Sequence, residues 1–439
     1  MVAAGAFAPG HLGELTQIVS FDLVDAALEA TRAVQVRVRA LPSRVVVYLL
    51  LAAALFEGMG YTQVWARLVA GLGGLTVFPG SSALSQARRR VGPKPLRALF
   101  DLVKGPAPGA VRWRGMLVCA VDGTSLYAPD SAANIAVYRR HRAGPNGDSG
   151  FPMLRLVAIV ACGTRTVLDA VFGPDSSGET TYAPRLFGCL GPQMLLLADR
   201  GFDAARIIEQ AAATGAQLLI RGQIKRKMPV LARLDDGSWL TRIGAVAVRI
   251  IDADIAITGT RDGRVTRRVE RYQLITTLTD PRRYHAADLI ELYHQRWEIE
   301  TTYLELKSTI LGGRVLRARH PDLVTQEIYA LLVAYQALRT AIADTALATG
   351  AITADRGSFT IALNTARDQV IHAAGVIADT VIDLAGAIGR AVLTAPLPRR
   401  RARSSPRVVK RAISKHRAKG NIDRNTYRLE IHIEILDNG

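Results

Sequence analysis

The chain is poor in cysteine and has none of the cysteine spacings that build metal sites or disulfide frameworks. Its 439 residues include 3 cysteines. Cys119, Cys162 and Cys189 stand singly, without a CxxC pair. This spacing excludes a disulfide scaffold and a cysteine zinc site, and it is typical of small core residues in a reducing compartment.

Long apolar runs are also absent. The longest, from Val45 to Phe56, is shorter than the roughly 20 residues that a membrane-spanning helix needs. The segment from Met1 to Leu15 lacks the basic start and apolar stretch of a signal peptide. We therefore expect a soluble, cytoplasmic protein with no membrane partner. The sequence also lacks a phosphate-binding GxxxxGK[ST] loop, a serine elbow, a cysteine dyad spacing and an internal repeat.

Acidic residues are few relative to basic ones. The 56 Lys and Arg residues exceed the 38 Asp and Glu residues, giving a formal net charge of +18. Such an excess indicates a polyanionic partner, either nucleic acid or an anionic membrane surface, and nucleic acid is preferred because no membrane segment is present. The hydrophobic content of 49% excludes general disorder, and the length indicates two or three domains.

The N-terminal quarter, from about residue 15 to 104, has the apolar spacing of helices. Within it, residues 81–103 predict two short helices around the Gly92-Pro93 break, and Arg88, Arg89 and Arg90 lie on the first. This pattern is compatible with a helix-turn-helix that reads duplex DNA. An ordinary helical bundle with a solvated basic face explains it equally well.

The period then changes to that of strands. Residues 115–121, 151–162 and 165–172 predict three strands joined by turns. A short helix near 180–190, a strand at 194–198, a helix at 202–214 and a strand at 216–220 follow, which together predict a mixed α/β sheet. The polar stretch 223–284 predicts a β insertion, and apolar helices return from 322 to 393.

Two features outside the sheet core suit nucleic acid. Trp239 follows cations at the entry of the insertion, where an exposed indole would stack on a base, although packing is the commoner role of such a Trp. A basic tail begins after Pro396, with cations from Arg399 to Lys419 and no acid among them. Such a run is either a solvated tail or a non-specific phosphate-binding segment.

Three acids are candidate metal ligands. Asp122 and Asp199 directly follow apolar strands, where α/β sheets bind ligands, although Asp is also a turn former. Residues 293–307 contain no Pro or Gly and predict one regular helix. At about 100° per residue, Glu300 lies on the same helix face as Arg296 and Lys307, whereas Glu298 and Glu305 point away from that face. The alternative is a solvated charged face. Three carboxylates beside cations suit two divalent ions that bridge a phosphodiester, and all-oxygen ligands favour Mg²⁺ or Mn²⁺.

The chain resembles the DDE transposases of bacterial insertion sequences, specifically the insertion-element-four family. The resemblance is carried by Asp122-Gly-Thr, by Leu197–Phe202 (LADRGF) and by the signature Y-x2-R-x3-E-x6-K. It implies a ribonuclease H-like core in which Asp122, Asp199 and Glu300 are catalytic and bind metal. The residues that we expect to contact DNA are Tyr293, Arg296, Lys307, Arg200, Trp239, Arg88, Arg89 and Arg90.

The resemblance also implies a reaction and an organisation. We expect metal-dependent cut-and-paste movement, in which the element's inverted-repeat ends are cut from double-stranded DNA and joined to target DNA by a homodimer. Two other functions stay open: a ribonuclease H-like nuclease or resolvase that cuts without joining, and a non-catalytic DNA-binding regulator. The expected segments are a helical N-terminal DNA-binding domain (1–110), the core (111–222), the insertion (223–284), the catalytic helix (285–320), C-terminal helices (321–395) and the basic tail (396–439).

Overall fold

The chain folds into two compact units. The computed structural model describes residues 10–35, 37, 41–72, 78–142, 148–224, 226–261, 264–376, 385–398 and 428–436. Unit 1 comprises Met1–Cys189 and Trp297–Leu397, and unit 2 comprises Leu190–Arg296 and Pro398–Gly439. The signature segment that the sequence places at 293–307 is therefore shared between the two units, with its first part in unit 2 and its second part in unit 1.

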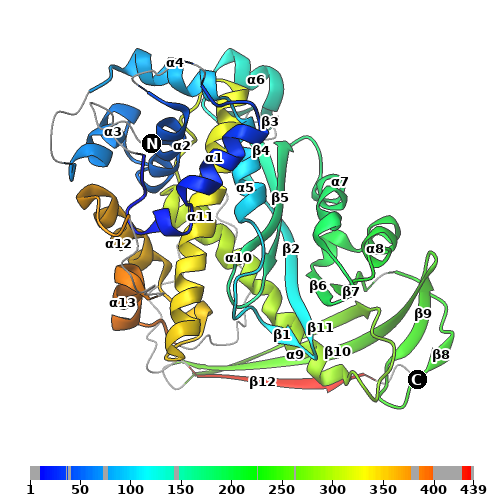
Figure 1. Cartoon of the computed structure of the whole chain (residues 1–439). Helices are drawn as coiled ribbons and strands as arrows, with labels where there is room; N and C mark the ends of the chain where they lie inside the picture. The colour runs from blue at the N-terminus through cyan, green and yellow to red at the C-terminus, as the bar shows by residue number, and fades with distance from the viewer. Residues whose placement is uncertain are drawn as a thin grey trace. The chain divides into compact units, whose positions relative to one another are not determined.

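The helical part of unit 1 surrounds one long helix, α11 (Pro321–Thr349), which begins with Pro321 and ends at Gly350 in the left-handed conformation (φ +60°). Most of α11 is buried, and its apolar residues surround the helix axis, as expected of a central helix. Helices from both ends of the chain pack on it, as Figure 1 shows for α2, α5, α12 and α13. The predicted N-terminal and C-terminal helices are confirmed as α1 (Phe21–Ala30), α2 (Ser43–Leu55), α3 (Tyr61–Val69), α4 (Ser81–Val91), α5 (Lys94–Val103), α12 (Phe359–His372) and α13 (Gly386–Thr394).

The sheet of unit 1 is antiparallel. Its central strand β4 (Asp148–Ala161) pairs with β2, with β5 and, through its first residues, with β3. The other elements of this part are β1 (Arg112–Trp113), β2 (Met116–Tyr127), α6 (Ala132–Tyr138), β3 (Arg140–Arg142), β5 (Val167–Pro174), α7 (Glu179–Tyr182) and the 3₁₀ segment η3 (Ala183–Cys189).

The prediction that the first strand ends at Asp122 is wrong. The ladder between β2 and β4 runs from Cys119 opposite Ala161 to Tyr127 opposite Met153, so Asp122 lies in mid-strand. The polar residues after Asp122 continue the strand because the long partner β4 supplies ladder hydrogen bonds along its whole length.

Unit 2 contains a parallel strand pair and a β-rich ribbon. Strands β6 (Met194–Ala198) and β7 (Gln217–Arg221) are parallel, and α8 (Ala205–Ala212) connects them, as the sequence predicts. β7 then pairs with β11 (Arg264–Thr276), which is antiparallel to β10 (Val246–Arg261). The predicted insertion is thus strand-rich, and it also contains β8 (Ala232–Arg233) and β9 (Trp239–Ile243).

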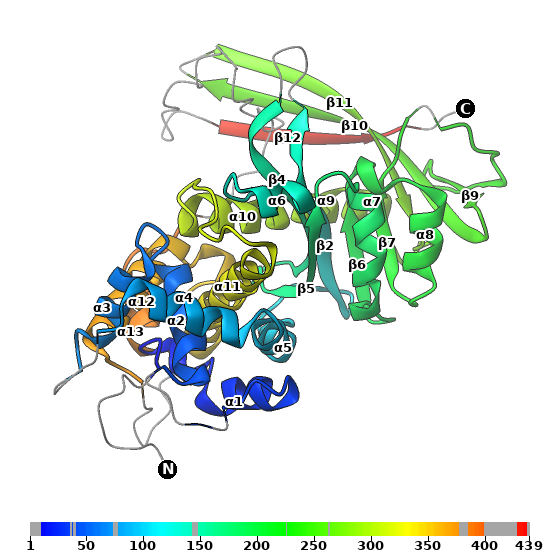
Figure 2. The same cartoon turned by 90° about the horizontal axis from the view of Figure 1, so that it is seen from above.

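One strand was missed. β12 (Arg428–Ile435) lies in the segment expected to be a basic tail, and it pairs with β10 from Ala253 to Thr260, as Figure 2 shows. Its sequence, RLEIHIEI, alternates apolar and polar residues with the period of a strand, which is the signal that identifies it. The cations from Arg399 to Lys419 lie outside the described residues.

The signature segment is helical but irregular, so the prediction of one regular helix is wrong. In unit 2, α9 (Ala286–Tyr293) continues into a 3₁₀ turn, η5 (His294–Arg296). In unit 1, α10 (Trp297–Leu304) continues into a π-helical turn, η6 (Glu305–Ile310). The spacing of 100° per residue does not hold at these two turns, and single π turns inside helices are frequent at functional sites.

The predicted fold class is confirmed. Three antiparallel strands are followed along the chain by helix, strand, helix and parallel strand, which is the element order of a ribonuclease H-like core. In the part of the chain that the structure describes, no helix has the length and apolar character needed to cross a membrane.

Candidate active site

Asp122 is fixed by its own strand. The side chain is partly buried, and its Oδ1 accepts a hydrogen bond of 2.7 Å from the Gly123 amide. Gly123 cannot be replaced without a shift, because a Cβ there would lie 2.4 Å from the side chain of Glu179. Glu179 in turn accepts a hydrogen bond of 2.8 Å from Arg155. Asp122 therefore lies on a strand whose next residue leaves no room for a side chain.

Asp199, in unit 2, occupies the position that the sequence predicts. It follows β6 directly, and its Oδ1 accepts a hydrogen bond of 2.7 Å from the Gly201 amide, which caps the short 3₁₀ turn η4 (Arg200–Phe202). Asp199 is partly buried and Arg200 is exposed. The carboxylate is thus held at the carboxyl end of a buried strand, where side chains point out of the sheet.

Tyr293 supports this strand end from α9. Its hydroxyl donates a hydrogen bond of 3.1 Å to the carbonyl of Ala198, the residue before Asp199. The side chain is 5% exposed, and burial raises the pKa of the phenol, so the hydroxyl stays protonated. This hydroxyl contacts the main chain of the protein, so in this structure Tyr293 has the geometry of a support for Asp199. Arg296, one turn later, is partly exposed.

Glu300 and Lys307, in unit 1, lie on α10 and on the π turn, and both are partly exposed. The ammonium of Lys307 donates a hydrogen bond of 3.2 Å to the Thr124 hydroxyl. Because Thr124 is two residues after Asp122 on β2, this contact brings the second half of the signature to the strand of the first acid.

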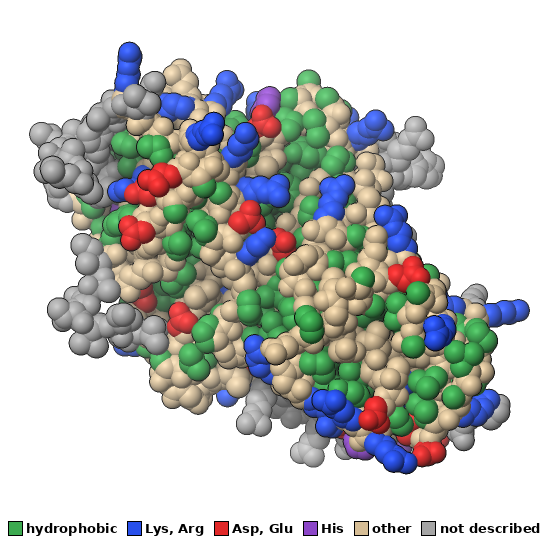
Figure 3. Space-filling view, turned by 45° about the vertical axis from the view of Figure 1, so that its right-hand side comes forward, with side chains coloured by type: hydrophobic (Ala, Val, Ile, Leu, Met, Phe, Trp, Pro, Cys, Tyr) green, Lys and Arg blue, Asp and Glu red, His purple; other side chains and the backbone are tan. Residues whose placement is uncertain are grey.

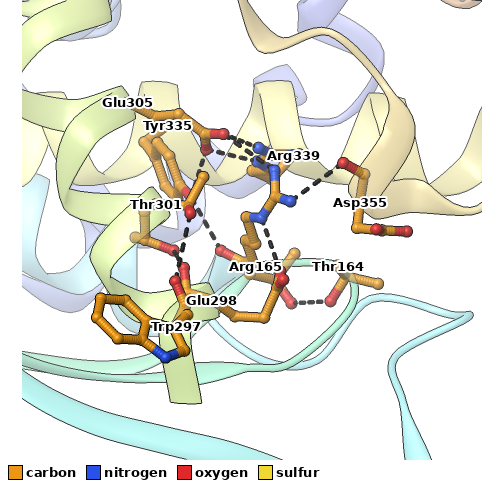
Figure 4. Close-up of polar contacts among 11 residues, drawn as sticks. Thr164, Arg165, Trp297, Glu298, Thr301, Glu305, Tyr335, Arg339 and Asp355 are labelled. Atoms are coloured by element: carbon orange, nitrogen blue, oxygen red, sulfur yellow. Dashed lines mark hydrogen bonds and ion pairs between the residues drawn. The ribbon is translucent and has the colours of Figure 1, made fainter. Parts of the chain in front are cut away.

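Glu298 and Glu305 lie on the same segment, but their side chains contact buried residues of the β4–β5 turn and of α11. They belong to a buried ionic cluster that we define as Arg165, Glu298, Glu305, Tyr335 and Arg339 (Figure 4). Arg165 binds Glu298 at 2.7 Å and Glu305 at 3.1 Å. Arg339 binds both oxygens of Glu305, and the Tyr335 hydroxyl donates to the same carboxylate at 3.1 Å.

The cluster is balanced in charge, with two guanidinium groups and two carboxylates. Burial alone would raise the pKa of Glu305, but the charges of Arg339 and Arg165 hold it below its usual value. Buried charges of this kind are stable only when they are paired and hydrogen-bonded. The cluster therefore anchors α10 and the π turn to α11 and to the β4–β5 turn, and no sequence pattern identifies Arg165 or Arg339 as members of it.

Two of the residues expected to contact DNA are buried in this structure. Trp239 is 8% exposed, and its indole N–H donates to Asp252 at 3.2 Å. It packs inside the insertion because the alternating strand β9 directs this position inward, so the expectation of an exposed indole is wrong. Arg88 is 6% exposed, and its guanidinium lies 3.7 Å from the centre of the Tyr61 ring.

The other two arginines of α4 remain at the surface. Arg89 and Arg90 are exposed, and Arg90 also donates a hydrogen bond of 2.7 Å to the carbonyl of Leu41. The predicted helices and the break between them are present, with α4 ending before Gly92 (φ +68°). On the face drawn in Figure 3, Lys and Arg side chains are spread widely, with no single large patch.

The donor set suits a hard divalent cation. Asp122, Asp199 and Glu300 offer only carboxylate oxygens, and each is partly exposed, so metal and solvent have access to them. Among the described residues, no group of three or more His, Cys, Asp or Glu side chains is already gathered closely enough to hold a metal ion. Asp122 and Glu300 belong to unit 1 and Asp199 to unit 2.

Two family models match the chain. The model of the insertion element 4 transposase N-terminal domain matches residues 9–101. The model of the transposase DDE domain matches residues 113–337, just over half of the chain.

Individual proteins are similar as well. The chain is 27% identical over 339 residues to the transposase InsG for insertion sequence element IS4 of Escherichia coli. This alignment covers 72% of this chain and 74% of that protein. It is 29% identical over 175 residues to the putative transposase InsZ of the same organism, covering 38% of this chain and 56% of that protein. A solved piggyBac transposase synaptic complex with hairpin DNA aligns over 89% of this chain and 86% of that chain, with 10% identity and a TM-score of 0.44.

Proposed function

The chain belongs to the insertion-element-four family of DDE transposases, and we propose that it moves an insertion sequence by a cut-and-paste reaction. The substrate is double-stranded DNA that carries the inverted-repeat ends of the element. The protein cuts the phosphodiester bonds at these ends and then joins the freed 3′ ends to target DNA. Family membership and the excess of basic residues support this proposal.

Asp122, Asp199 and Glu300 are the proposed catalytic residues and metal ligands. The observation that carries the assignment is the hydrogen bond from Lys307 to Thr124, which joins the segment bearing Glu300 to the strand bearing Asp122. Two Mg²⁺ or Mn²⁺ ions, when bound, would activate the attacking hydroxyl and stabilise the leaving oxygen. The three carboxylates would hold the ions, and the partly exposed Lys307 and Arg296 would bind phosphate oxygens of the DNA.

Other residues bind the flanking DNA. Arg200 and Arg89 are exposed and have the charge to contact phosphates outside the cut. We assign the DNA-binding role to the N-terminal helices, and we propose that the protein acts as a homodimer that brings two element ends together. Tyr293 serves as a support for the strand end at Asp199, as its buried hydroxyl suggests.

The test uses a supercoiled plasmid that carries the element's own ends, incubated with the purified protein and Mg²⁺ or a chelator. Asp122→Asn, Asp199→Asn and Glu300→Gln should each abolish cleavage while end binding persists, because metal ligation is lost and the basic surface remains. The matched control is Glu291→Gln, an exposed acid on α9, which should cleave normally. Retained cleavage in one of the three variants would remove that residue from the site.

The same experiment separates the alternative functions. Pre-cut ends and a target plasmid test joining directly, and cleavage without joining would identify a nuclease or resolvase. Binding that needs no metal, with no cleavage in Mg²⁺ or Mn²⁺, would identify a regulator.

A further inference from the structure

The hydroxyl of Tyr303 lies between the two central strands of unit 1. Tyr303, on α10, donates a hydrogen bond of 2.6 Å to the carbonyl of Asp122. It accepts a hydrogen bond of 3.1 Å from the amide of Ala158. Asp122 and Ala158 are partners in the β2–β4 ladder, so the hydroxyl contacts both strands at the level of the first acid.

The Tyr303 hydroxyl acts both as a hydrogen-bond donor and as an acceptor. A phenol hydroxyl has one hydrogen to donate and lone pairs that accept. Here it donates to the main-chain carbonyl of Asp122 and accepts from the main-chain amide of Ala158. The side chain is 5% exposed, and burial raises the pKa of the phenol well above its ordinary value.

Tyr303 also shares a helix face with Glu300. The two residues are three positions apart on α10, and residues at this spacing are neighbours on a helix. A contact between Tyr303 and the Asp122 main chain thus sets the distance from the strand to the face that carries Glu300.

We propose that Tyr303 is a positioning residue that holds Asp122 in register with Glu300 for metal binding. This inference rests on the proposed function, because only that function assigns a shared metal ion to Asp122 and Glu300. Partners that orient metal ligands typically contribute 10- to 100-fold in metal affinity or activity.

The helix has other anchors, which makes the role of the hydroxyl separable from folding. The buried ionic cluster holds the same segment through Glu298 and Glu305. The ring of Tyr303 keeps its packing when only the hydroxyl is removed. Tyr303→Phe should therefore fold, with a melting temperature within a few degrees of the wild type.

The experiment compares Tyr303→Phe with Tyr329→Phe, a change of the same kind at a buried tyrosine of α11. Mn²⁺ binding is followed by electron paramagnetic resonance, and plasmid cleavage is measured over a range of Mg²⁺ concentrations. We expect Tyr303→Phe to bind Mn²⁺ about 10-fold more weakly and to need correspondingly more Mg²⁺ for cleavage, with end binding unchanged. Tyr329→Phe should match the wild type, and 3-fluorotyrosine at position 303, which keeps the hydroxyl, should restore Mn²⁺ binding.

The outcomes are distinct. Wild-type Mn²⁺ affinity in Tyr303→Phe, or an equal loss in Tyr329→Phe, would overturn the positioning role. If Tyr303→Phe does not fold, p-aminophenylalanine at position 303, a weaker hydrogen-bond donor of similar size, takes its place: weakened Mn²⁺ binding would support the positioning role, and wild-type binding would overturn it. If Asp122→Asn itself cleaves normally, the proposed site fails instead, whatever Tyr303 does.

Discussion

Lys307 donates a hydrogen bond of 3.2 Å from its Nζ to the hydroxyl of Thr124, across the interface between the π turn and β2. The ammonium is thereby held two residues from Asp122, and its partly exposed position leaves it in contact with solvent. Because the π turn changes the direction of side chains relative to a regular helix, Lys307 reaches β2 from a position that the helical wheel does not describe.

The first prediction concerns Lys307 and its acceptor. Lys307→Ala removes a charge from the proposed phosphate site, so the slope of log affinity against log salt for end DNA should fall by about one. Thr124→Val keeps the charge and removes only the acceptor, so it should leave the slope unchanged and reduce cleavage. Binding titrations over a range of salt concentrations measure both. A matched control is Lys104→Ala, since Asp101 and Asp169 already pair with that ammonium.

The second prediction concerns Glu305 in the buried ionic cluster. Glu305→Gln leaves Arg339 and Arg165 with too little negative charge, and breaking a buried pair of this kind costs about 3 to 5 kcal/mol. The variant should melt several degrees lower at neutral pH. Thermal unfolding of wild type and variant gives the measurement, and an exposed change such as Glu291→Gln should have almost no effect.

The pH dependence of this difference has a definite sign. The folded protein holds the pKa of Glu305 below its usual value of 4.5, because the charges of Arg339 and Arg165 outweigh the effect of burial. The stabilisation is therefore fully present above pH 4.5, and it decreases as the pH falls through the lower pKa of the folded state. The gap in melting temperature between wild type and Glu305→Gln should shrink on acidification, and a gap that widens would contradict the assignment.

Much of this fold follows from local patterns. The strands at 194–198 and 217–221 and the helices of the N-terminal region were predictable because each carries an apolar period bounded by turn residues. The position of Asp122 in mid-strand was not, since it depends on the length of a partner strand that is distant in the sequence. β12 was obscured by the basic residues before it.

The candidate site was predictable only in part, because some of its contacts come from residues that are distant in the sequence. The signature residues are visible in the sequence, and Glu298 and Glu305 could be separated from Glu300 by angle alone. Arg165 and Arg339, which pair with Glu298 and Glu305, belong to a turn and a helix that are distant in the sequence. Whether an aromatic or an arginine is exposed, as with Trp239 and Arg88, depends on tertiary packing that composition does not contain.

The third prediction follows from the burial of Trp239. Trp239→Phe removes the indole donor to Asp252, which also accepts from Gln273 at 3.0 Å, and the insertion should lose about 1 to 3 kcal/mol of stability. Affinity for element ends should stay at the wild-type value, because the side chain does not reach the surface. Fluorescence anisotropy with labelled end DNA measures it, and a large loss of affinity in a folded variant would restore the stacking role.

The fourth prediction separates two adjacent arginines of α4. Arg89 is exposed, so Arg89→Met should lower the salt slope of DNA binding by about one if the helix contacts a phosphate. Arg88 is buried over the Tyr61 ring, so Arg88→Met should leave the slope unchanged. The two substitutions alter charge equally, which makes each the control for the other.

Arg88→Met should have only a small effect on the stability of the folded protein. Burial lowers the pKa of Arg88, and its Nε and one Nη have no hydrogen-bond partner among the described residues, so the charge is poorly compensated. A desolvated cation–π contact contributes about 2 kcal/mol, and an unsatisfied buried donor costs about 1 to 3 kcal/mol, so the two terms nearly cancel in Arg88→Met. The melting temperature should therefore change by only a few degrees. A fall in the salt slope of Arg88→Met equal to that of Arg89→Met would show instead that Arg88 leaves the Tyr61 ring to contact DNA.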